Sequence, residues 1–340
     1  MTTTSRPWSR RDFVNGLSLA GTAGLAGLRA GPAAAEPPPE TTTLRVLKGG
    51  DTICVAPQYV AEELLRYEGF TDVRYVSPAP GVGFHKFLAS GDVNIGMDLA
   101  ASQLTAIDLG VPMVMLAGVH VGCFELFGTD RVRTIRDLKG KTVAVPGLRT
   151  APHLILSIMA AYVGLDPRRD INWVEHSDEE SIALLAAGKV DAFLGFPPAP
   201  QELRARKIGH LVINTGTDKP WSQYFCCVVA APREFVRKHP AATKRALRAI
   251  LKAADVCARE PARAAQFLVD KGYASRYDYA LQALQDVSYA KWREYNPEDT
   301  VRYYALRLHE LGMIKTSPQK LIAQGTDWRF LTELKRELKG

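Results

Sequence analysis

The sequence predicts an α/β protein built from two similar units, in which short apolar strands alternate with helices on both faces of a parallel or mixed sheet. Two observations carry this prediction. Short apolar runs alternate with longer segments whose apolar residues recur at helical spacing. In addition, one phrase occurs twice: FLASGDVNIGMD at 87–98 returns 97 residues later as LLAAGKVDAFLG at 184–195, with the same Leu, Ala, Gly and Val.

In the first unit, the alternation predicts four strands, at 43–48, 72–76, 94–97 and 113–119. We expect a helix to begin at Pro57, where the missing N–H costs nothing, and to end at Gly69. A loop and helix over 81–88 should end at Gly91, and another helix should begin at Asp98.

The second unit repeats this order. Strands are predicted at 142–145, 171–175 and 192–196, and helices at 151–163 and 181–187, the latter ending at Gly188. The repeated phrase is therefore interpreted as a helix, a glycine with positive φ that ends it, and a strand entering the core. The polar residue after the shared valine, Asn94 or Asp191, is expected to anchor the strand start by a local hydrogen bond.

After an apolar strand that begins at Phe225, the chain is predicted to be almost wholly helical. The helices are expected at 241–258, 261–271, 278–285, 297–311 and 327–339. In the first of these, one face carries an apolar stripe that should dock on a sheet; its residues are Leu247, Ile250, Leu251 and Ala254.

Length and charge narrow the class of protein. The 340 residues suffice for two domains, and 46% hydrophobic residues provide material for buried cores. The net charge is +7, of which residues 1–35 contribute +3. The remaining excess contains no dense block of Lys and Arg, so we do not expect binding to nucleic acid.

The N-terminus resembles a twin-arginine export signal. Arg10 and Arg11 follow Ser9, a weakly apolar run follows from Val14, and small residues at 33–35 suit a signal peptidase. We therefore expect a signal peptide at 1–35, a flexible linker at 36–42 and a periplasmic location for the mature chain. The alternative interpretation is a disordered N-terminal arm.

The five cysteines do not predict a disulfide framework, because their number is odd and their spacings do not repeat; they are Cys54, Cys123, Cys226, Cys227 and Cys257. No CxxC pair is present, and we expect no histidine at zinc-ligand spacing from these cysteines. Buried free thiols are the favoured interpretation. We predict no metal ion and no cofactor.

Several phrases resemble the solute-binding proteins of ATP-binding-cassette (ABC) importers, in the subgroup for nitrate, sulfonates, taurine and the thiamine pyrimidine. They are DLKGKTVAV with GLRTAPHLIL, GLDPRRDINWVEH, LLAAGKVDAFLG, and EFVRKHPAATKRALRAILKA with EPARAAQFL. The resemblance covers the chain from about Thr43 to its C-terminus. It implies a periplasmic binding protein type II fold of two lobes, each a mixed sheet flanked by helices, which close on a ligand.

The resemblance also implies how the chain is divided. Lobe one is expected at 43–127 and 224–340, lobe two at 128–223, with crossovers near 120–127 and 221–225. The expected function is that of an extracytoplasmic solute-binding component, monomeric and without catalytic residues. Its partners would be a small-molecule ligand and an ABC permease in the inner membrane.

Candidate ligand-binding residues follow strands, because ligands of open α/β sheets bind beyond the carboxyl ends of the strands. They are Gly50, Asp51, Thr52, Gly83, His85, Asp98, Ala100, Ser102, Arg149, Thr150, Phe196, Trp221 and Tyr224. Gly83 belongs to a GxG whose backbone N–H groups suit an anion, and Arg149 stands at a helix entrance that suits a sulfonate, carboxylate or phosphate. The aromatic members suit stacking on a planar ligand.

Each of these candidates also has a purely structural interpretation. Asp51 can stabilise a plain turn, Asp98 can cap a helix, and Phe196 can pack at a hinge. Arg149 favours an anionic ligand, whereas Asp51 and Asp98 disfavour a bare dianion. A small organic anion or zwitterion, aromatic or heterocyclic, reconciles them.

Two alternatives from other classes stay open. The first is an enzyme resembling the thiamine-pyrimidine synthases, which use iron and a cysteine-rich run; here only Cys226 and Cys227 are adjacent, and no Ser/His/Asp triad order, HExxH or Walker motif stands out. The second is a sensor that presents its ligand to a membrane receptor instead of a permease.

Overall fold

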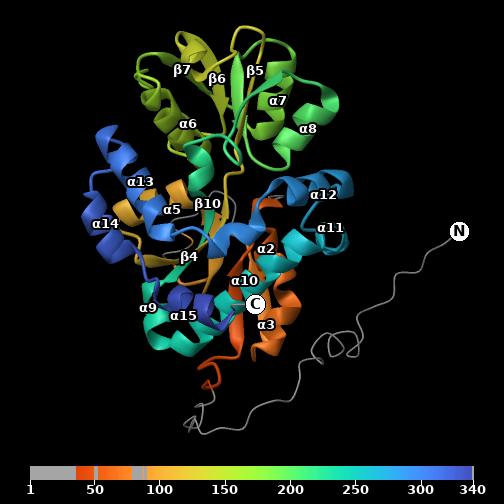
Figure 1. Ribbon diagram of the computed structural model, residues 1–340, viewed down its shortest axis with the longest axis vertical. Coiled ribbons are helices and arrows are strands. Elements are labelled where there is room, and N and C mark those ends of the chain that lie inside the picture. Colours follow the sequence, from red (N-terminus) through yellow and green to blue (C-terminus); the bar gives the residue numbers. More distant parts are fainter. Residues whose placement is uncertain (1–35, 50–52, 79–86, 88–89, 339–340) are drawn as a thin grey trace, which may run out of the picture. The chain divides into compact units, whose positions relative to one another are not determined.

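Buried strand β1 (Thr43–Leu47), whose Leu44 and Val46 are fully enclosed, starts the first of two sheet assemblies in the computed structural model (Figure 1). The structure describes residues 36–49, 53–78, 87 and 90–338. The predicted signal peptide therefore lies outside the described residues. The residues from Pro37 to Gly340 form one unit, described by itself below.

The first assembly consists of a two-stranded sheet and a three-stranded sheet that one isolated bridge connects. In spatial order the strands are β2 (Asp72–Val76), β1, β3 (Gly96–Leu99), β10 (Phe225–Pro232) and β4 (Met113–Val121). β2 and β1 are parallel, and a parallel bridge between Val46 and Ile95 joins β1 to the segment leading into β3. β10 runs antiparallel to both β3 and β4. We call this assembly the first sheet.

The second sheet repeats this arrangement. Its strands, in spatial order, are β7 (Ile171–Glu175), β6 (Lys141–Val145), β8 (Ala192–Gly195), β5 (Glu125–Gly128) and β9 (His210–Asn214). β7, β6 and β8 are parallel, and β5 runs antiparallel to both β8 and β9. In each sheet, three parallel strands from one stretch of chain are therefore continued by an antiparallel strand.

The repeated phrase is part of this architecture. Asn94 Oδ1 accepts a hydrogen bond from the backbone N–H of Arg45, and Asp191 Oδ2 accepts one from the N–H of Thr142, both at 2.8 Å. The donors, like the acceptors, are 97 residues apart. Gly91 and Gly188 have φ values of 78° and 65°. The predicted glycine conformation is confirmed, but the polar anchor is a bond to another strand instead of a local one.

Helices cover the sheets. Around the second sheet lie η2 (Ile135–Leu138), α6 (Ala151–Tyr162), α7 (Asp178–Ala186) and α8 (Ala199–Arg206), at the top of Figure 1. The other helices are η1 (Ile53–Val55), α2 (Ala56–Val60), α3 (Glu62–Tyr67), α5 (Ala100–Asp108), η3 (Trp221–Gln223), α9 (Arg233–Lys238), α10 (Pro240–Arg259), α11 (Pro261–Asp270), α12 (Tyr277–Asp286), η4 (Tyr289–Arg293), α13 (Pro297–Glu310), α14 (Pro318–Gly325) and α15 (Arg329–Glu337).

Helix α10 carries the predicted apolar stripe. Leu247, Ile250, Leu251 and Ala254 are fully buried, and the helix packs against α2, α3 and β4. Burial of each leucine or isoleucine side chain among them contributes roughly 1.5–3 kcal/mol to the stability of the fold. Helix α10 thus covers the first sheet, as the periodicity predicts.

Three expectations about element boundaries are wrong. Asp98 lies within β3, and Leu99 occupies the N-cap position of α5, so Asp98 does not cap that helix. The helix expected from residue 181 begins at Asp178 because the Ser177 hydroxyl accepts a hydrogen bond from the N–H of Glu180. Strand β3 starts two residues later than expected, since Asn94 is used in the bond to Arg45.

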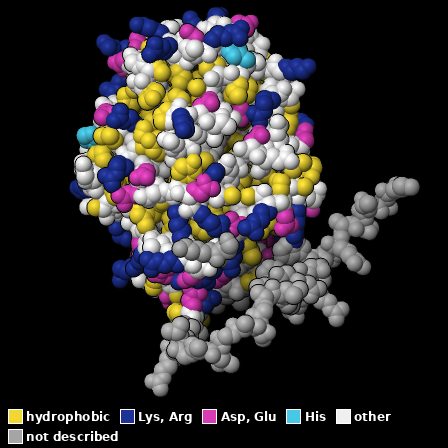
Figure 2. Space-filling model, in the orientation of Figure 1, with side chains coloured by type: hydrophobic (Ala, Val, Ile, Leu, Met, Phe, Trp, Pro, Cys, Tyr) yellow, Lys and Arg dark blue, Asp and Glu magenta, His cyan; other side chains and the backbone are white. Residues whose placement is uncertain are grey.

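The surface charges are largely paired with one another. On the face shown in Figure 2, Lys and Arg side chains are interspersed with Asp and Glu. Arg248, on α10, contacts Glu68 at 2.7 Å and Glu337 at 3.1 Å, which ties α10 to the ends of α3 and α15. None of the helices in the part of the chain that the structure describes has the length and apolar character that a membrane-spanning helix requires.

Two segments carry the chain between the sheets. The outgoing one links β4 to β5, and the returning one links β9 to β10. Thr215 holds them together: its hydroxyl oxygen accepts from the N–H of Phe124 at 2.8 Å, and its own N–H donates to the Phe124 carbonyl at 2.9 Å. Gly122 adopts a φ of 42°, and a Cβ there would lie 2.1 Å from the Thr215 carbonyl oxygen. This close approach requires glycine.

We expect the substitution Gly122→Ala to lower the free energy of unfolding by about 3 kcal/mol or more, because it adds a backbone clash to the cost of a left-handed conformation. Gly188→Ala is the matched control, since its φ is 65° and no atom lies within 4 Å of the added Cβ. It should cost only about 1 kcal/mol. Urea unfolding curves of both variants measure this, and equal losses would contradict the argument.

Candidate ligand-binding site

The carboxyl ends of parallel strands from both sheets lead into helices that touch each other. β3 runs directly into α5, and β6 runs through the loop 146–150 into α6. Helix α5 packs against α6. Because ligands of open α/β sheets bind beyond these strand ends, the two entrances define the candidate site.

Asp98 supplies a carboxyl group at the first entrance. It lies near the end of β3, opposite Val228 of β10, and is partly buried. Burial raises the pKa of Asp98 to about 7, with a smaller contribution from Cys54, while a hydrogen bond from the Leu99 N–H opposes the shift. Near neutral pH this carboxyl is therefore partly protonated and can donate a hydrogen bond to an anionic ligand instead of repelling it. Ala100 and Ser102 follow in the first turn of α5, and Ala100 is buried.

Arg149 and Thr150 stand at the second entrance, directly before α6. Arg149 has a φ of 69°, and its backbone N–H donates to His153 Nδ1 at 3.1 Å. Its exposed guanidinium donates to the carbonyl of Met313 at 2.9 Å, in the turn after α13. The Thr150 hydroxyl donates to the Gly147 carbonyl at 2.6 Å and is thus used within its own loop.

His153 faces the same loop as a neutral group. Burial and, to a smaller extent, the charge of Arg149 lower the pKa of His153 to about 4, whereas Glu175 raises it slightly. A neutral imidazole whose Nδ1 accepts from the Arg149 N–H holds that residue in its left-handed conformation. The hydrogen bond to His153 therefore explains the conformation of Arg149 as well as a role in ligand binding would.

The predicted aromatic residues pack near the two crossing segments. Phe196, after β8, meets Phe124 edge to face with ring centroids 5.7 Å apart. Tyr224 stacks on Tyr303 of α13 at 3.9 Å. The Trp221 ring is 5% exposed, and its Nε1 has no hydrogen-bond partner among the described residues. Packing thus explains the positions of Phe196 and Tyr224, whereas the indole N–H of Trp221 is a hydrogen-bond donor without a partner among the described residues.

Five predicted site residues lie outside the described residues: Gly50, Asp51, Thr52, Gly83 and His85. The glycine spacing at 81–83 and the turn at 49–52 stay predictions. Helix α5 packs against α6, but no hydrogen bond or ion pair among the described residues joins Asp98, Ala100 or Ser102 to Arg149 or Thr150, so a site that they share stays a prediction.

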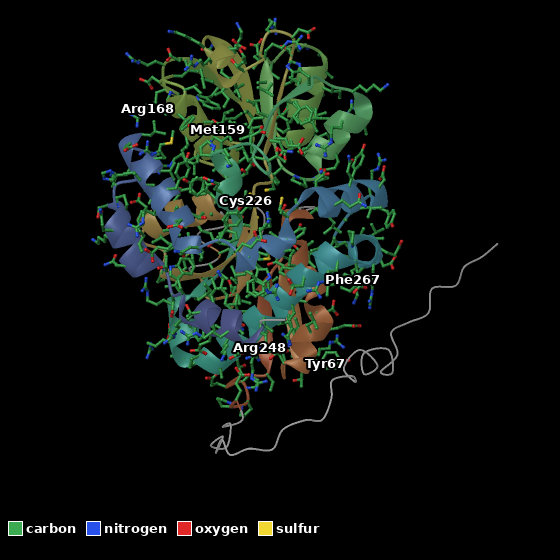
Figure 3. All side chains as sticks on the ribbon, in the orientation of Figure 1. Tyr67, Met159, Arg168, Cys226, Arg248 and Phe267 are labelled. Carbon is green, nitrogen blue, oxygen red and sulfur yellow. The ribbon has the colours of Figure 1, made fainter. Side chains whose placement is uncertain are left out.

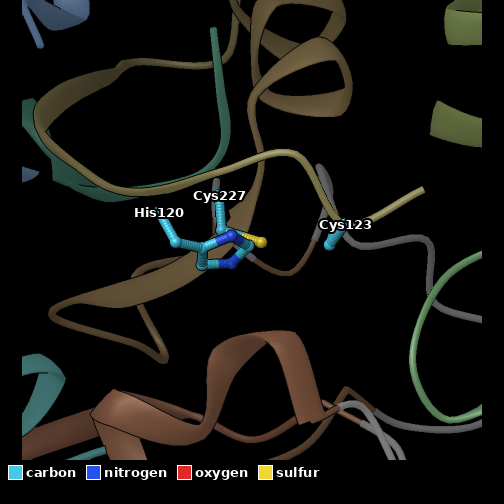
Figure 4. A group of neighbouring side chains, drawn as sticks. All are labelled: His120, Cys123 and Cys227. Carbon is cyan, nitrogen blue, oxygen red and sulfur yellow. The ribbon is translucent and has the colours of Figure 1, made fainter. Parts of the chain in front are cut away.

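Sequence reasoning missed a cluster of four thiols and one imidazole beside Asp98. The ligand atoms of His120, Cys123 and Cys227 all lie within 4.8 Å of one another, and all three residues are buried (Figure 4). Cys54 adjoins this group, since its carbonyl oxygen lies 3.0 Å from His120 Nε2, and Cys226 precedes Cys227 in β10. The expectation of buried, free cysteines is confirmed. The statement that no histidine stands at ligand spacing is wrong, because His120 precedes Cys123 by three residues.

The cluster belongs to the same region as the candidate site. Asp98 interacts electrostatically with Cys54 and Cys226, and the buried Tyr304 interacts with Cys226 and Cys123. Figure 3 places Cys226 near the middle of the view, between the helices that flank the two sheets. The spacing HVGC at 120–123, inside an apolar run, is the signal from which the cluster could have been suspected.

Several solved structures with the same fold are bacterial periplasmic binding proteins. The periplasmic nitrate-binding protein NrtA of Synechocystis PCC 6803 superposes with a TM-score of 0.73 and 16% identity, covering 89% of this chain and 90% of that one. The sulfonate-binding protein SsuA of Methylobacillus flagellatus KT gives 0.68 and 19%, covering 87% and 94%. Escherichia coli SsuA gives 0.66 and 16%, covering 83% and 91%. The chain therefore has the periplasmic binding protein fold, which confirms the predicted fold class.

Sequence comparison agrees with this assignment. Residues 39–268 match the NMT1-like family. A curated relative, the nitrate import ATP-binding protein NrtC of Synechocystis, is 25% identical over 173 residues, which are 48% of this chain. The match spans only 26% of the length of NrtC.

The raised pKa of Asp98 predicts how stability depends on pH. Because the unfolded carboxyl ionises near pH 4 and the folded one near pH 7, the aspartate destabilises the fold increasingly as pH rises through this interval. We expect Asp98→Asn to be more stable than the parent by about 1–3 kcal/mol at pH 8, and the gain to vanish near pH 4. Urea unfolding at both pH values measures this, and a gain independent of pH would contradict it.

Proposed function

The chain belongs to the NMT1-like family, and from this premise we propose that it is the extracytoplasmic solute-binding component of an ABC importer. The observation that carries the proposal is the pair of sheets with one common strand order, joined by two crossing segments. The proteins NrtA and SsuA, described as periplasmic nitrate-binding and sulfonate-binding, have the same fold over most of this chain. Binding, instead of catalysis, is the function proposed.

In this proposal the two sheets are the cores of two lobes. The sequence predicts lobe one at 43–127 and 224–340 and lobe two at 128–223. Because β5 (Glu125–Gly128) belongs to the second sheet, we move the first boundary, so that lobe one comprises 43–124 and 224–340 and lobe two comprises 125–223. The segments β4–β5 and β9–β10, held together by Thr215, would act as the hinge. A ligand would bind where α5 and α6 begin, and rotation about the crossing would close one lobe over it.

Contacts between the lobes on two sides support a closing motion of this kind. On one side, Arg149 and Arg168 donate to the carbonyls of Met313 and Leu311, in the turn between α13 and α14; Figure 3 labels Arg168. On the other side, Arg204 of α8 pairs with Asp286 of α12 in the other lobe and also with Glu125 of β5 in its own lobe. Such contacts stabilise one of two lobe arrangements and must break for ligand to enter or leave.

The polar groups at the site favour a small organic anion or zwitterion with an aromatic or heterocyclic part. Arg149 provides a positive charge, and Asp98 provides a carboxyl that a cationic or donor group of a zwitterion can approach. The unpartnered Nε1 of Trp221 provides a further donor. The neighbouring rings of Phe196 and Tyr224 suit a planar ligand.

We further propose that residues 1–35 export the chain by the twin-arginine pathway and that the mature protein is a periplasmic monomer. It would deliver its ligand to an ABC permease of the inner membrane. A membrane receptor is the alternative recipient. Genes for a permease and an ATPase beside the gene for this chain would support delivery to an importer.

The test is to identify and measure the ligand. Mass spectrometry of small molecules that copurify with the mature protein supplies candidates, and calorimetric titration against nitrate, taurine, alkanesulfonates and aromatic zwitterions ranks them. Small-angle scattering should show a smaller radius of gyration with the ligand bound. Tight binding of nitrate alone would exclude the organic ligand. Stoichiometric iron together with product formation would show that the chain is an enzyme and not a binding protein.

If Arg149 contacts the ligand, Arg149→Ala should weaken binding of the identified ligand at least about tenfold, as expected for a lost charge-assisted hydrogen bond. The midpoint of thermal unfolding should change little, because the side chain is exposed. Arg168→Ala is the matched control, since Arg168 reaches the same turn after α13 without standing at the entrance to α6. Equal losses in both variants would assign Arg149 to lobe contact alone.

If the contacts between the lobes favour closure, Asp286→Asn should weaken ligand binding about two- to tenfold, because it removes the charge that Arg204 meets from α12. Asp278→Asn on the same helix is the control, since Asp278 pairs with Arg276 beside it and not with the other lobe. Calorimetry and scattering measure both effects. An unchanged affinity for Asp286→Asn would remove this contact from the closing mechanism.

A further inference from the structure

Four of the five cysteines gather at one place in the fold. Cys54 comes from η1, Cys123 from the segment between β4 and β5, and Cys226 and Cys227 from the start of β10. His120, near the end of β4, completes the group. These segments are distant in sequence, so the fold itself, and not a local motif, brings the sulfur and nitrogen atoms together.

The distances suit a single small cation. The ligand atoms of His120, Cys123 and Cys227 lie within 4.8 Å of one another. Around a tetrahedral ion with metal–sulfur bonds of about 2.3 Å and a metal–nitrogen bond of about 2.0 Å, ligand atoms are roughly 3.5–3.8 Å apart. Small side-chain rotations would therefore bring these three ligands to one ion. Cys54 and Cys226 do not belong to the group of atoms within 4.8 Å, so either would have to move to supply a fourth ligand.

The imidazole is oriented as metal-binding histidines usually are. His120 is completely buried, and its Nε2 lies 3.0 Å from the carbonyl oxygen of Cys54. Because a carbonyl only accepts, Nε2 carries a proton, and Nδ1 is the nitrogen left for a metal ion, which would replace any proton bound there. Its contact with the Val121 carbonyl is long, at 3.5 Å. A histidine that donates one N–H to a backbone carbonyl has its other nitrogen fixed for a ligand.

The donor set selects a class of metal. Thiolates are soft ligands that favour zinc(II) and copper(I), and imidazole suits both, whereas calcium and magnesium require oxygen ligands. Asp98 is the neighbouring carboxyl group that interacts with Cys54 and Cys226. Exposed fractions of 5% for Cys226 and 6% for Cys123, against none for Cys54, His120 and Cys227, place the access route on the side of Cys123 and Cys226.

We propose that His120, Cys123 and Cys227, with a fourth thiolate from Cys54 or Cys226, form a binding site for one zinc(II) or copper(I) ion. This site adjoins the proposed solute site at Asp98, whose strand pairs with the strand that carries Cys227, but the proposal does not depend on the identity of the solute. On binding, each ligating thiol loses its proton to the solvent while the imidazole binds through its free lone pair. The ion keeps its oxidation state, and no oxidant or reductant takes part in the step.

The competing explanation is that the thiols only fill space. Buried cysteine behaves as a small apolar residue, and Cys257 on α10 is an example. Simple packing does not require a buried imidazole among the thiols, nor does it explain why four of five cysteines adjoin. A disulfide among them is the other competing outcome, and it would remove two ligands.

Cobalt(II) is the first probe, because tetrahedral thiolate coordination gives it intense thiolate-to-metal absorption in the near ultraviolet and visible bands. The mature protein, kept reduced and without oxygen, should bind one cobalt(II) ion with these bands, and zinc(II) should displace it. A separate titration with copper(I), buffered by a chromophoric chelator, tests the second metal. Proton release measured in weak buffer should accompany binding.

Variants then assign the ligands. Cys227→Ser, Cys123→Ser and His120→Gln should each weaken zinc(II) or copper(I) binding at least about 100-fold and alter the cobalt(II) spectrum. Cys54→Ser and Cys226→Ser compared with each other identify the fourth ligand. Cys257→Ser is the control and should leave both affinity and spectrum unchanged. Circular dichroism establishes that each variant is folded. The cobalt(II) spectrum of the parent protein tests the proposed site without any variant.

Three outcomes would overturn the proposal. One is the absence of binding at one equivalent of cobalt(II), zinc(II) and copper(I) to the reduced protein. Another is an octahedral cobalt(II) spectrum without thiolate bands. The third is an intact mass two hydrogens lower in protein isolated from the periplasm, with peptide mapping that places a disulfide among Cys54, Cys123, Cys226 and Cys227. None of these results would affect the proposed solute binding, which the ligand titrations test separately.

Discussion

The close approach of two backbone segments at Gly122 and Thr215 is the constraint on which the remaining structure depends. The chain leaves the first sheet between Val121 and Glu125 and returns between Asn214 and Phe225. The two segments touch, with Thr215 bonded to both backbone groups of Phe124, so both passages of the chain between the sheets lie at one place. Everything proposed about lobe closure requires such a joint, since broad packing between two sheets would resist rotation.

On the two sides of this joint, the chain uses the same local arrangement of helix end and strand start. A glycine ends the helix, and a polar side chain one or two residues before the strand binds the backbone of the first strand in its unit, Asn94 with Arg45 and Asp191 with Thr142. Each bond ties neighbouring parallel strands together. Since β5 and β10 then extend the sheets with the opposite direction, each sheet receives one strand from the connection to the other half.

These relations explain which features the sequence could predict. The parallel strands and the helices between them are encoded locally, by apolar periodicity and by glycines such as Gly69, Gly91 and Gly188 that have positive φ. β5 and β9 escaped detection because β5 follows β4 with no turn signal and β9 has exposed positions along an edge. The sequence predicts a strand crossover around the glycine of HVGC at 120–123. It cannot predict that this position requires glycine, because the close approach involves Thr215, which lies far along the chain.

The same reasoning applies to the site. A residue's position after a strand can be read from sequence, which is why Asp98 and Arg149 were found at helix entrances. What surrounds such a residue cannot be read in this way, because the thiols beside Asp98 come from η1, β10 and the crossing segment. His120 and Cys123 were passed over because each, taken alone, resembles an ordinary core residue. Their chemistry arises from a third residue, Cys227, more than a hundred positions later.

The joint and the thiol cluster occupy adjacent positions in the chain, and this has a mechanical consequence. Cys123 lies between Gly122, which approaches Thr215, and Phe124, which Thr215 binds. The other cluster residues belong to β4, β10 and η1, on the side of the first sheet. A cation held there would tie the crossing segment to the first sheet without bonding to the second. It would therefore stiffen the base of the joint and leave the second sheet free to turn above it.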